Sequence, residues 1–96
     1  MSARIEVAPA GDSRYAVTVY SVGATTEHQV AIPPRLLEDL DLGPDDEARL
    51  VYTSFEFLLE REPSSSILRS FDLDVIGRYF PDYIETIRRQ MAPGGS

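Results

Sequence analysis

The sequence predicts an α+β fold, in which an N-terminal antiparallel sheet of two or three strands precedes three to four helices. Residues 4–32 alternate apolar and polar side chains and are rich in β-branched and aromatic residues. Residues 36–40 instead space their apolar side chains as one face of a helix requires, and residues 48–62 contain no residue suited to a hairpin turn. The chain of 96 residues suits one domain, which we expect over residues 1–91 with a disordered tail at 92–96.

Three segments near the N-terminus are predicted to be strands because apolar side chains alternate in them. These segments are residues 4–8, 15–22 and 27–32. Clusters of turn-forming residues separate them at 9–13 and 23–26. Pro33 ends the last strand because proline has no amide hydrogen to donate to a neighbouring strand.

A short helix is predicted next, with Pro34 at its first position and Gly43 as its C-terminal cap. The following stretch, residues 48–62, decides the fold. Its periodicity fits both a helix, with Val51, Phe55 and Leu58 on one face, and a strand. It contains no Gly, Pro, Asn or Asp that could form a hairpin turn, and it is long for a single strand. We therefore predict the longest helix near residues 45–62.

The C-terminal third is predicted to be helical in shorter pieces. Residues 67–71 form a short amphipathic turn after the possible N-caps at 64–66. A last helix begins at Pro81, and its apolar residues Ile84, Ile87 and Met91 follow at helical spacing.

Composition argues against several classes of function. The chain has no cysteine, which rules out disulfides and thiolate metal sites. The net charge is -7, and the nine basic residues, all arginines, are scattered, whereas nucleic acids and anionic membranes need clustered basic groups. We therefore expect no membrane partner and regard nucleic acid as an unfavourable one. The N-terminus lacks the apolar stretch of a signal peptide, so we expect a cytoplasmic location.

His28 is the only histidine, and it lies beside Val30 on the apolar side of a predicted strand. A metal ligand or general base would need partners, and no cysteine or second histidine can join it. Ser21 and Ser54 lack the sequence context of a nucleophile. We expect a packed histidine, no catalytic residue, no metal, no cofactor and hence a protein that is not an enzyme.

Six acidic residues fall within ten positions: Glu38, Asp39, Asp41, Asp45, Asp46 and Glu47. A calcium loop starting at Asp39 or Asp41 would need a glutamate at its twelfth position. Leu50 and Tyr52 stand there instead, so the spacing excludes a calcium loop of this type. The acids form either a solvated junction between two helices or a docking face for a basic partner.

Two apolar features leave alternatives open. Leu50 and Phe57 lie seven residues apart and point away from the main apolar stripe of the long helix. They are either exposed anchors for a partner or core residues covered by the C-terminal segment. Tyr79, Phe80 and Tyr83 surround Pro81, and they form either core packing or a peptide-binding groove.

Several motifs resemble a group of short uncharacterised bacterial proteins, mostly actinobacterial. The matching segments are Val17-Thr18-Val19, His28-Gln29-Val30, Phe55 to Pro63, Ser66-Ile67-Leu68, Phe71-Asp72-Leu73 and Tyr79 to Tyr83. The resemblance covers about residues 15–89. The group has no established activity, so the resemblance implies no site residues.

Residues 28–62 also resemble, more weakly, the SpoVT/AbrB-like swapped-hairpin antitoxins. Val30 to Pro33, followed by Leu40, Leu42 and Pro44-Asp45, matches their strand, Ile-Pro, short-helix and Leu-x-Leu pattern. That resemblance implies a dimeric DNA-binding regulator, with extended chain where we predict the longest helix.

The sequence thus favours a small acidic protein-interaction or adaptor module that binds an unknown protein partner, a second copy being one candidate. The predicted partner surface consists of Leu50, Phe57 and the acids Glu38, Asp39, Asp41, Asp45, Asp46 and Glu47. The alternative is a swapped-hairpin DNA-binding transcriptional regulator or antitoxin.

Overall fold

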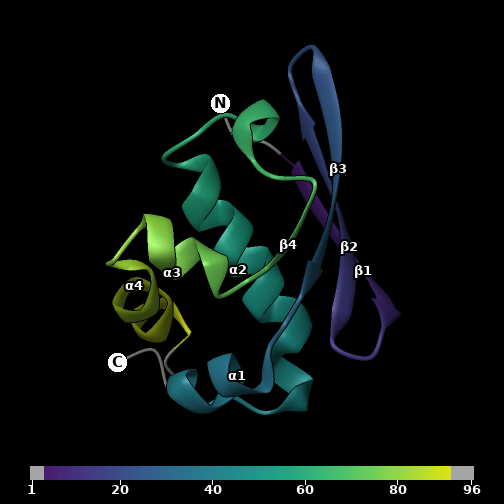
Figure 1. The fold of residues 1–96 in the computed structure, drawn as a ribbon. Coiled ribbons are helices and arrows are strands. Elements are labelled where there is room, and N and C mark those ends of the chain that lie inside the picture. The colour runs from purple at the N-terminus through teal and green to yellow at the C-terminus, as the bar shows by residue number, and fades with distance from the viewer. Residues whose placement is uncertain (1–3, 92–96) are drawn as a thin grey trace.

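The structure, a computed structural model, describes residues 4–91. Three strands come first, and a fourth follows much later in the chain: β1 (Arg4–Gly11), β2 (Arg14–Ser21), β3 (Ala24–Ala31) and β4 (Ser70–Asp72). They form one sheet in the order β1-β2-β3-β4 (Figure 1). The first three strands are antiparallel, and β4 joins β3 in parallel.

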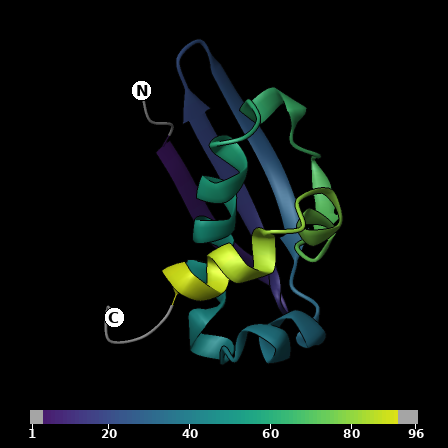
Figure 2. The ribbon, with the colours of Figure 1, turned by 90° about the vertical axis from the view of Figure 1, so that its left-hand side faces the viewer.

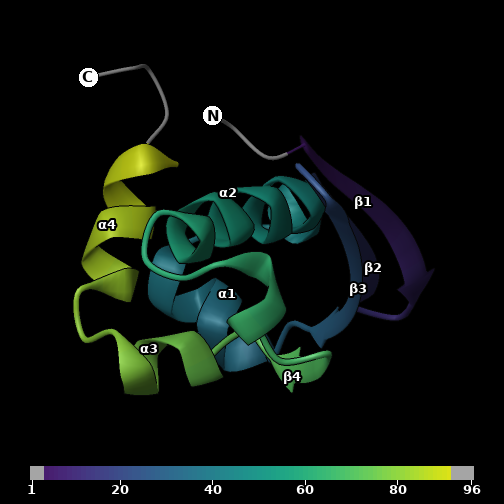
Figure 3. The same ribbon diagram turned by 90° about the horizontal axis from the view of Figure 1, so that it is seen from above.

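The helices all lie on one face of this sheet (Figure 3). They are α1 (Pro34–Leu40), α2 (Glu47–Leu59), α3 (Val75–Tyr79) and α4 (Tyr83–Gln90), with 3-10 turns η1 (Pro44–Asp46) and η2 (Ser64–Ser66). Figure 2 shows α4 in front of α2 and the sheet behind both. The outer face of the sheet is left to side chains such as Glu6, Thr18 and Glu27, which lie side by side on β1, β2 and β3.

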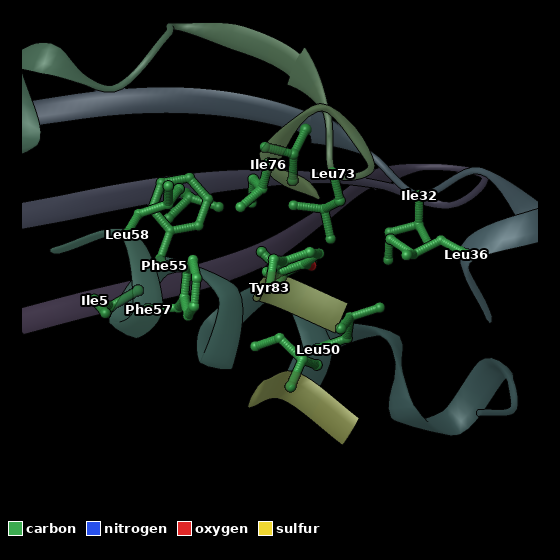
Figure 4. Packing of buried hydrophobic residues seen from close by; sticks show 14 of the residues in the cluster. Ile5, Ile32, Leu36, Leu50, Phe55, Phe57, Leu58, Leu73, Ile76 and Tyr83 are labelled. Atoms are coloured by element: carbon green, nitrogen blue, oxygen red, sulfur yellow. The ribbon is translucent and has the colours of Figure 1, made fainter. Parts of the chain in front are cut away.

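The core lies between the sheet and the helices (Figure 4). Alternate strand residues point into it, including Val17 and Val19, which are at most 1% exposed. The middle helix contributes two sides, because α2 is covered both by the sheet and by α4. Its buried apolar residues are Leu50, Val51, Phe55, Phe57 and Leu58.

The predicted α+β class is confirmed, with an N-terminal meander followed by helices. Both predicted turns are shorter than expected. Gly11 pairs with Arg14, and Ser21 pairs with Ala24, so each hairpin turns over only two residues. The second residue of each turn has a positive φ angle, 52° at Ser13 and 78° at Gly23, as such tight turns favour.

The sheet has four strands, whereas two or three were predicted. The additional strand, β4, lies where a helical turn was predicted at residues 67–71, so that prediction is wrong. Gln29 donates its amide hydrogen to Arg69 (2.6 Å), and Leu73 donates to Ala31 (2.9 Å). This segment therefore satisfies its backbone along the edge of β3 instead of within a helix. The predicted tail at 92–96 lies outside the described residues.

Residues 48–62, on which the predicted fold depended, are largely helical, as predicted. The longest helix, α2, covers Glu47–Leu59, somewhat less than the predicted 45–62. The proline at 44 starts a separate 3-10 turn, in which the Asp46 carboxylate accepts a hydrogen bond from the Gly43 amide (3.1 Å). At its other end the helix stops at Leu59, four residues before Pro63.

Candidate functional site

An apolar groove opens between the end of α2, the segment before β4, and α3. It holds a volume of about 270 Å³. Its lining residues are Leu58, Glu62, Ser66, Ile67, Leu68, Phe71, Val75, Ile76, Tyr79 and Phe80. We refer to it as the Leu68–Tyr79 groove, after its two exposed large apolar residues.

The rim and the floor of the groove differ in exposure. Leu68 is 53% exposed and Tyr79 is 70% exposed, although both are large and largely apolar. Leu58, Ile67 and Ile76 are buried and connect the floor to the core. Large apolar side chains exposed around a hollow are typical of interaction sites.

His28 fixes the backbone at the Leu68 end of the groove. Its Nδ1 donates a hydrogen bond to the Leu68 carbonyl (2.8 Å), and its Nε2 shares one with the Thr26 hydroxyl (2.9 Å). The ring also lies 5.4 Å from the Phe55 ring, centroid to centroid. The expectation of a packed histidine is confirmed, since the residue is 2% exposed. Its polar atoms hold the groove in place and do not open into it.

Pro81 shapes the Tyr79 end of the groove. A residue before proline avoids helical angles, and Phe80 accordingly ends α3 in an extended conformation (φ -130°). The Phe80 ring turns inward and meets the Phe57 ring edge-on at 5.8 Å. Tyr79, still in the helix, is left facing solvent. The cluster predicted around Pro81 therefore divides, with Phe80 and Tyr83 packed and Tyr79 open.

Glu62 is the one charged side chain among the lining residues. The neighbouring Arg61 does not neutralise it, because its guanidinium lies 3.7 Å from the Phe57 ring centroid and pairs with Asp82 at 2.8 Å. Within residues 4–91, no ion pair includes Glu62. The groove therefore has one negative end.

Leu50 and Phe57, predicted as part of a partner surface, are core residues in the structure. They are 0% and 1% exposed, respectively. The cause is α4, which covers this side of α2 and places the Tyr83 ring 5.4 Å from the Phe57 ring. The alternative of burial under the C-terminal segment is the one observed, and these two residues offer no surface to a partner.

The predicted acidic surface is divided among different roles. Glu38, Asp39, Asp41 and Asp45 are exposed around the α1–α2 junction, whereas Asp46 caps η1. Glu47 is only 9% exposed and accepts hydrogen bonds from Ser13 (3.2 Å) and the Tyr15 hydroxyl (3.0 Å). Burial, together with that hydrogen bond to Glu47, raises the pKa of Tyr15. Glu47 thus ties α2 to the sheet.

Between residues 4 and 91, no group of three or more His, Asp or Glu side chains is placed to hold a metal ion. No helix in that range has the length and apolar character needed to cross a membrane. Comparison of the chain with family models, curated proteins and solved structures gives no match.

Proposed function

We propose that this chain is a protein-interaction module that binds a short apolar segment of a partner protein in the Leu68–Tyr79 groove. The observation that carries this proposal is the exposure of Leu68 and Tyr79 beside an apolar floor. Burying such side chains against a partner stabilises a complex by about 25 cal/mol per Å² of apolar surface, before the costs of association.

The size and charge of the groove indicate the chemistry of the segment. Its volume of about 270 Å³ lies below the roughly 300–1,000 Å³ of typical small-molecule pockets. It therefore suits a few side chains better than a cofactor. Glu62 at one end favours a segment that carries an arginine or lysine next to its apolar residues. The net charge of -7 attracts basic partners in the same sense.

The groove is supported from both sides, which limits the entropy lost on binding. His28 holds the Leu68 backbone to β3, and the Phe80 ring is packed against Phe57. A preformed site loses less conformational freedom than one that orders on contact. The walls therefore need only side-chain rotations to accept a ligand.

Selection of peptides from a random displayed library on the purified chain tests the proposal. We expect enrichment of peptides that combine two apolar side chains with one basic residue. Titration of an enriched peptide should show at least about a tenfold loss of affinity for Tyr79→Ala, as expected for loss of an anchoring aromatic. Tyr52→Ala is the matched control, because Tyr52 is 42% exposed on α2 and does not line the groove. Equal affinity for both variants would contradict the proposal.

The DNA-binding alternative draws no support from the fold. A swapped hairpin needs extended chain over residues 48–62, and α2 occupies Glu47–Leu59. In addition, only Arg35 is basic in α1, where that family would meet DNA. We therefore put forward the interaction module alone.

A further inference from the structure

Among residues 4–91, β1 lies at the edge of the sheet with only β2 beside it (Figure 1). Its outer backbone groups face away from β2 along a strand of eight residues. An edge strand of this length pairs with another strand unless its sequence prevents it.

The obstacles to pairing are confined to one end of β1. Pro9 has no amide hydrogen, and the register with β2 shifts between Pro9 and Gly11. The preceding residues, from Arg4 to Ala8, pair regularly with β2 and carry neither obstacle. The open part of the edge is therefore its N-terminal half.

The charged side chains on this half of β1 are complementary to those of a second copy of the strand that runs antiparallel to it. Arg4 and Glu6 share the outer face and are 76% and 50% exposed, while Ile5 between them faces the core. If a second β1 runs antiparallel with Ile5 opposite Ile5, each Arg4 stands opposite the other copy's Glu6. Opposite charges directly across such a pair are stabilising.

Other alignments of the two β1 strands are less favourable than the one centred on Ile5, each for a physical reason. Centring the pair on Arg4 or on Glu6 places like charges opposite each other. Centring it on Val7 places Pro9 opposite Ile5, and the strand loses a ladder hydrogen bond or its regular geometry there. The two registers shifted by one residue exchange the inner and outer faces, and they place Ile5 opposite Arg4 or opposite Glu6.

We infer that two copies of the chain associate through β1, antiparallel about Ile5, into one continuous sheet. The two-fold axis is perpendicular to the sheet, so both helical layers lie on the same side. The second copy covers apolar surface that one copy leaves open, since Val7 on β1 is only half-buried. The groove lies near β4, at the opposite edge, so this inference is independent of the proposed function.

Charge reversal tests the interface. Sedimentation equilibrium should show a dimer for the natural sequence, and Arg4→Glu or Glu6→Arg alone should weaken it about tenfold or more by placing like charges across both pairs. An equimolar mixture of these two variants should form a heterodimer, in which every pair is again of opposite charge. Arg4 and Glu6 of one chain also form an ion pair (3.2 Å), but its loss cannot explain that rescue, because both variants lack it.

Glu27→Arg is the matched control, since Glu27 lies on the same row of the outer face but on β3. It makes the same change in charge and should leave the dimer intact. Circular dichroism checks that each variant is folded. A natural chain that stays monomeric at every concentration, a mixture that does not associate, or a Glu27→Arg variant as weak as Glu6→Arg would overturn the inference.

Cysteine cross-linking tests the register, because the chain has no cysteine of its own. Opposed residues of an antiparallel pair have Cα atoms about 4.5–5.5 Å apart, within the roughly 4.4–6.8 Å that a disulfide spans. Ile5→Cys should therefore form a disulfide dimer on mild oxidation. Val7→Cys should not, because its counterpart is displaced by four residues along the strand. Cross-linking of Val7→Cys and not Ile5→Cys would contradict this register.

Discussion

Two apolar regions lie beside α2, and they differ mainly in whether the chain covers them. Between α2 and α4, Phe57 and Tyr83 are at most 1% exposed. In the Leu68–Tyr79 groove, two side chains of similar character remain more than half exposed. Tyr79 and Tyr83 are only four residues apart, so residue type does not explain the difference. The covered region serves stability, and the open one is available for a ligand.

The difference has local causes at Arg61 and Pro81. Arg61 lies over the Phe57 ring and pairs with Asp82, which closes the covered region toward solvent. The turn at Pro81 sends Phe80 inward and starts α4 at Tyr83, so α4 returns over α2 and leaves Tyr79 of α3 exposed. A change on one side of the comparison should therefore affect stability, and a change on the other should affect binding.

The largest contrast is expected between two aromatic truncations. Phe57→Ala removes a buried ring and should lower the free energy of unfolding by about 3–5 kcal/mol. Tyr79→Ala removes an exposed ring and should change it by less than about 0.5 kcal/mol. Urea denaturation followed by circular dichroism measures both. Similar losses for the two variants would show that the groove is also part of the structural core.

The second-largest effect is expected at alkaline pH, which should destabilise the covered region. Burial raises the pKa of Tyr83 to about 12 from its ordinary value of 10.0. The folded state therefore holds the phenol proton more tightly than the unfolded state, and stability is lost as pH rises from 10 toward 12. A shift of this size corresponds to about 2–3 kcal/mol.

Tyr83→Phe is the control for this pH dependence, because it removes the titrating group. Its free energy of unfolding should fall less steeply between pH 10 and pH 12 than that of the natural sequence. Tyr15, whose pKa is also raised, remains in both proteins and contributes equally. Identical slopes would mean that Tyr83 is not the group responsible.

A smaller loss should follow from the buried hydrogen bond in the covered region. The Ser54 and Tyr83 hydroxyls are 2.7 Å apart, and Ser54 is 0% exposed. Ser54→Ala leaves the phenol without its partner and should cost about 1–3 kcal/mol of unfolding free energy. Ser66→Ala, at the exposed wall of the groove, is the matched control and should be close to neutral. Thermal unfolding measures both variants, and equal losses of stability for Ser54→Ala and Ser66→Ala would contradict this prediction.

The smallest expected effect concerns charge at the groove. Glu62→Gln should leave stability unchanged and weaken binding of a basic peptide by up to about fivefold, as for an exposed ion pair. Isothermal titration at low and high salt measures this loss, which should shrink as salt screens the charge. Glu60→Gln is the control, because Glu60 pairs with Arg61 at 3.7 Å outside the groove. A larger effect of Glu60→Gln would place the ligand elsewhere.

The parts of the fold that the sequence predicted correctly depend on local chemistry. Alternation predicted the three strands of the meander, and the absence of turn residues over 48–62 predicted α2. The fourth strand could not be predicted this way. Ser70–Asp72 has only three residues, and its pairing depends on where residues 69–73 meet β3 in space.

The candidate site was not predicted, because none of the residues expected to form the partner surface lines the groove. Helical spacing shows which residues share a face, but it does not show which neighbour covers that face. The sequence therefore leaves open whether Leu50 and Phe57 are buried, and in the structure α4 covers them. A groove at Tyr79 was one of two alternatives for the aromatic residues around Pro81, the other being core packing, whereas Glu62 and Leu68 join the groove only through tertiary contacts. The link from His28 to Leu68 spans forty residues and has no local signal in the sequence.

The most direct test of the account is amide chemical-shift mapping of the natural sequence with a selected peptide. The account predicts that the largest shifts fall on Leu68, Phe71 and the α3 residues up to Tyr79, with α4 little affected. Shifts confined to the β2–β3 turn around Val22, the other strongly exposed apolar residue (83%), would contradict it.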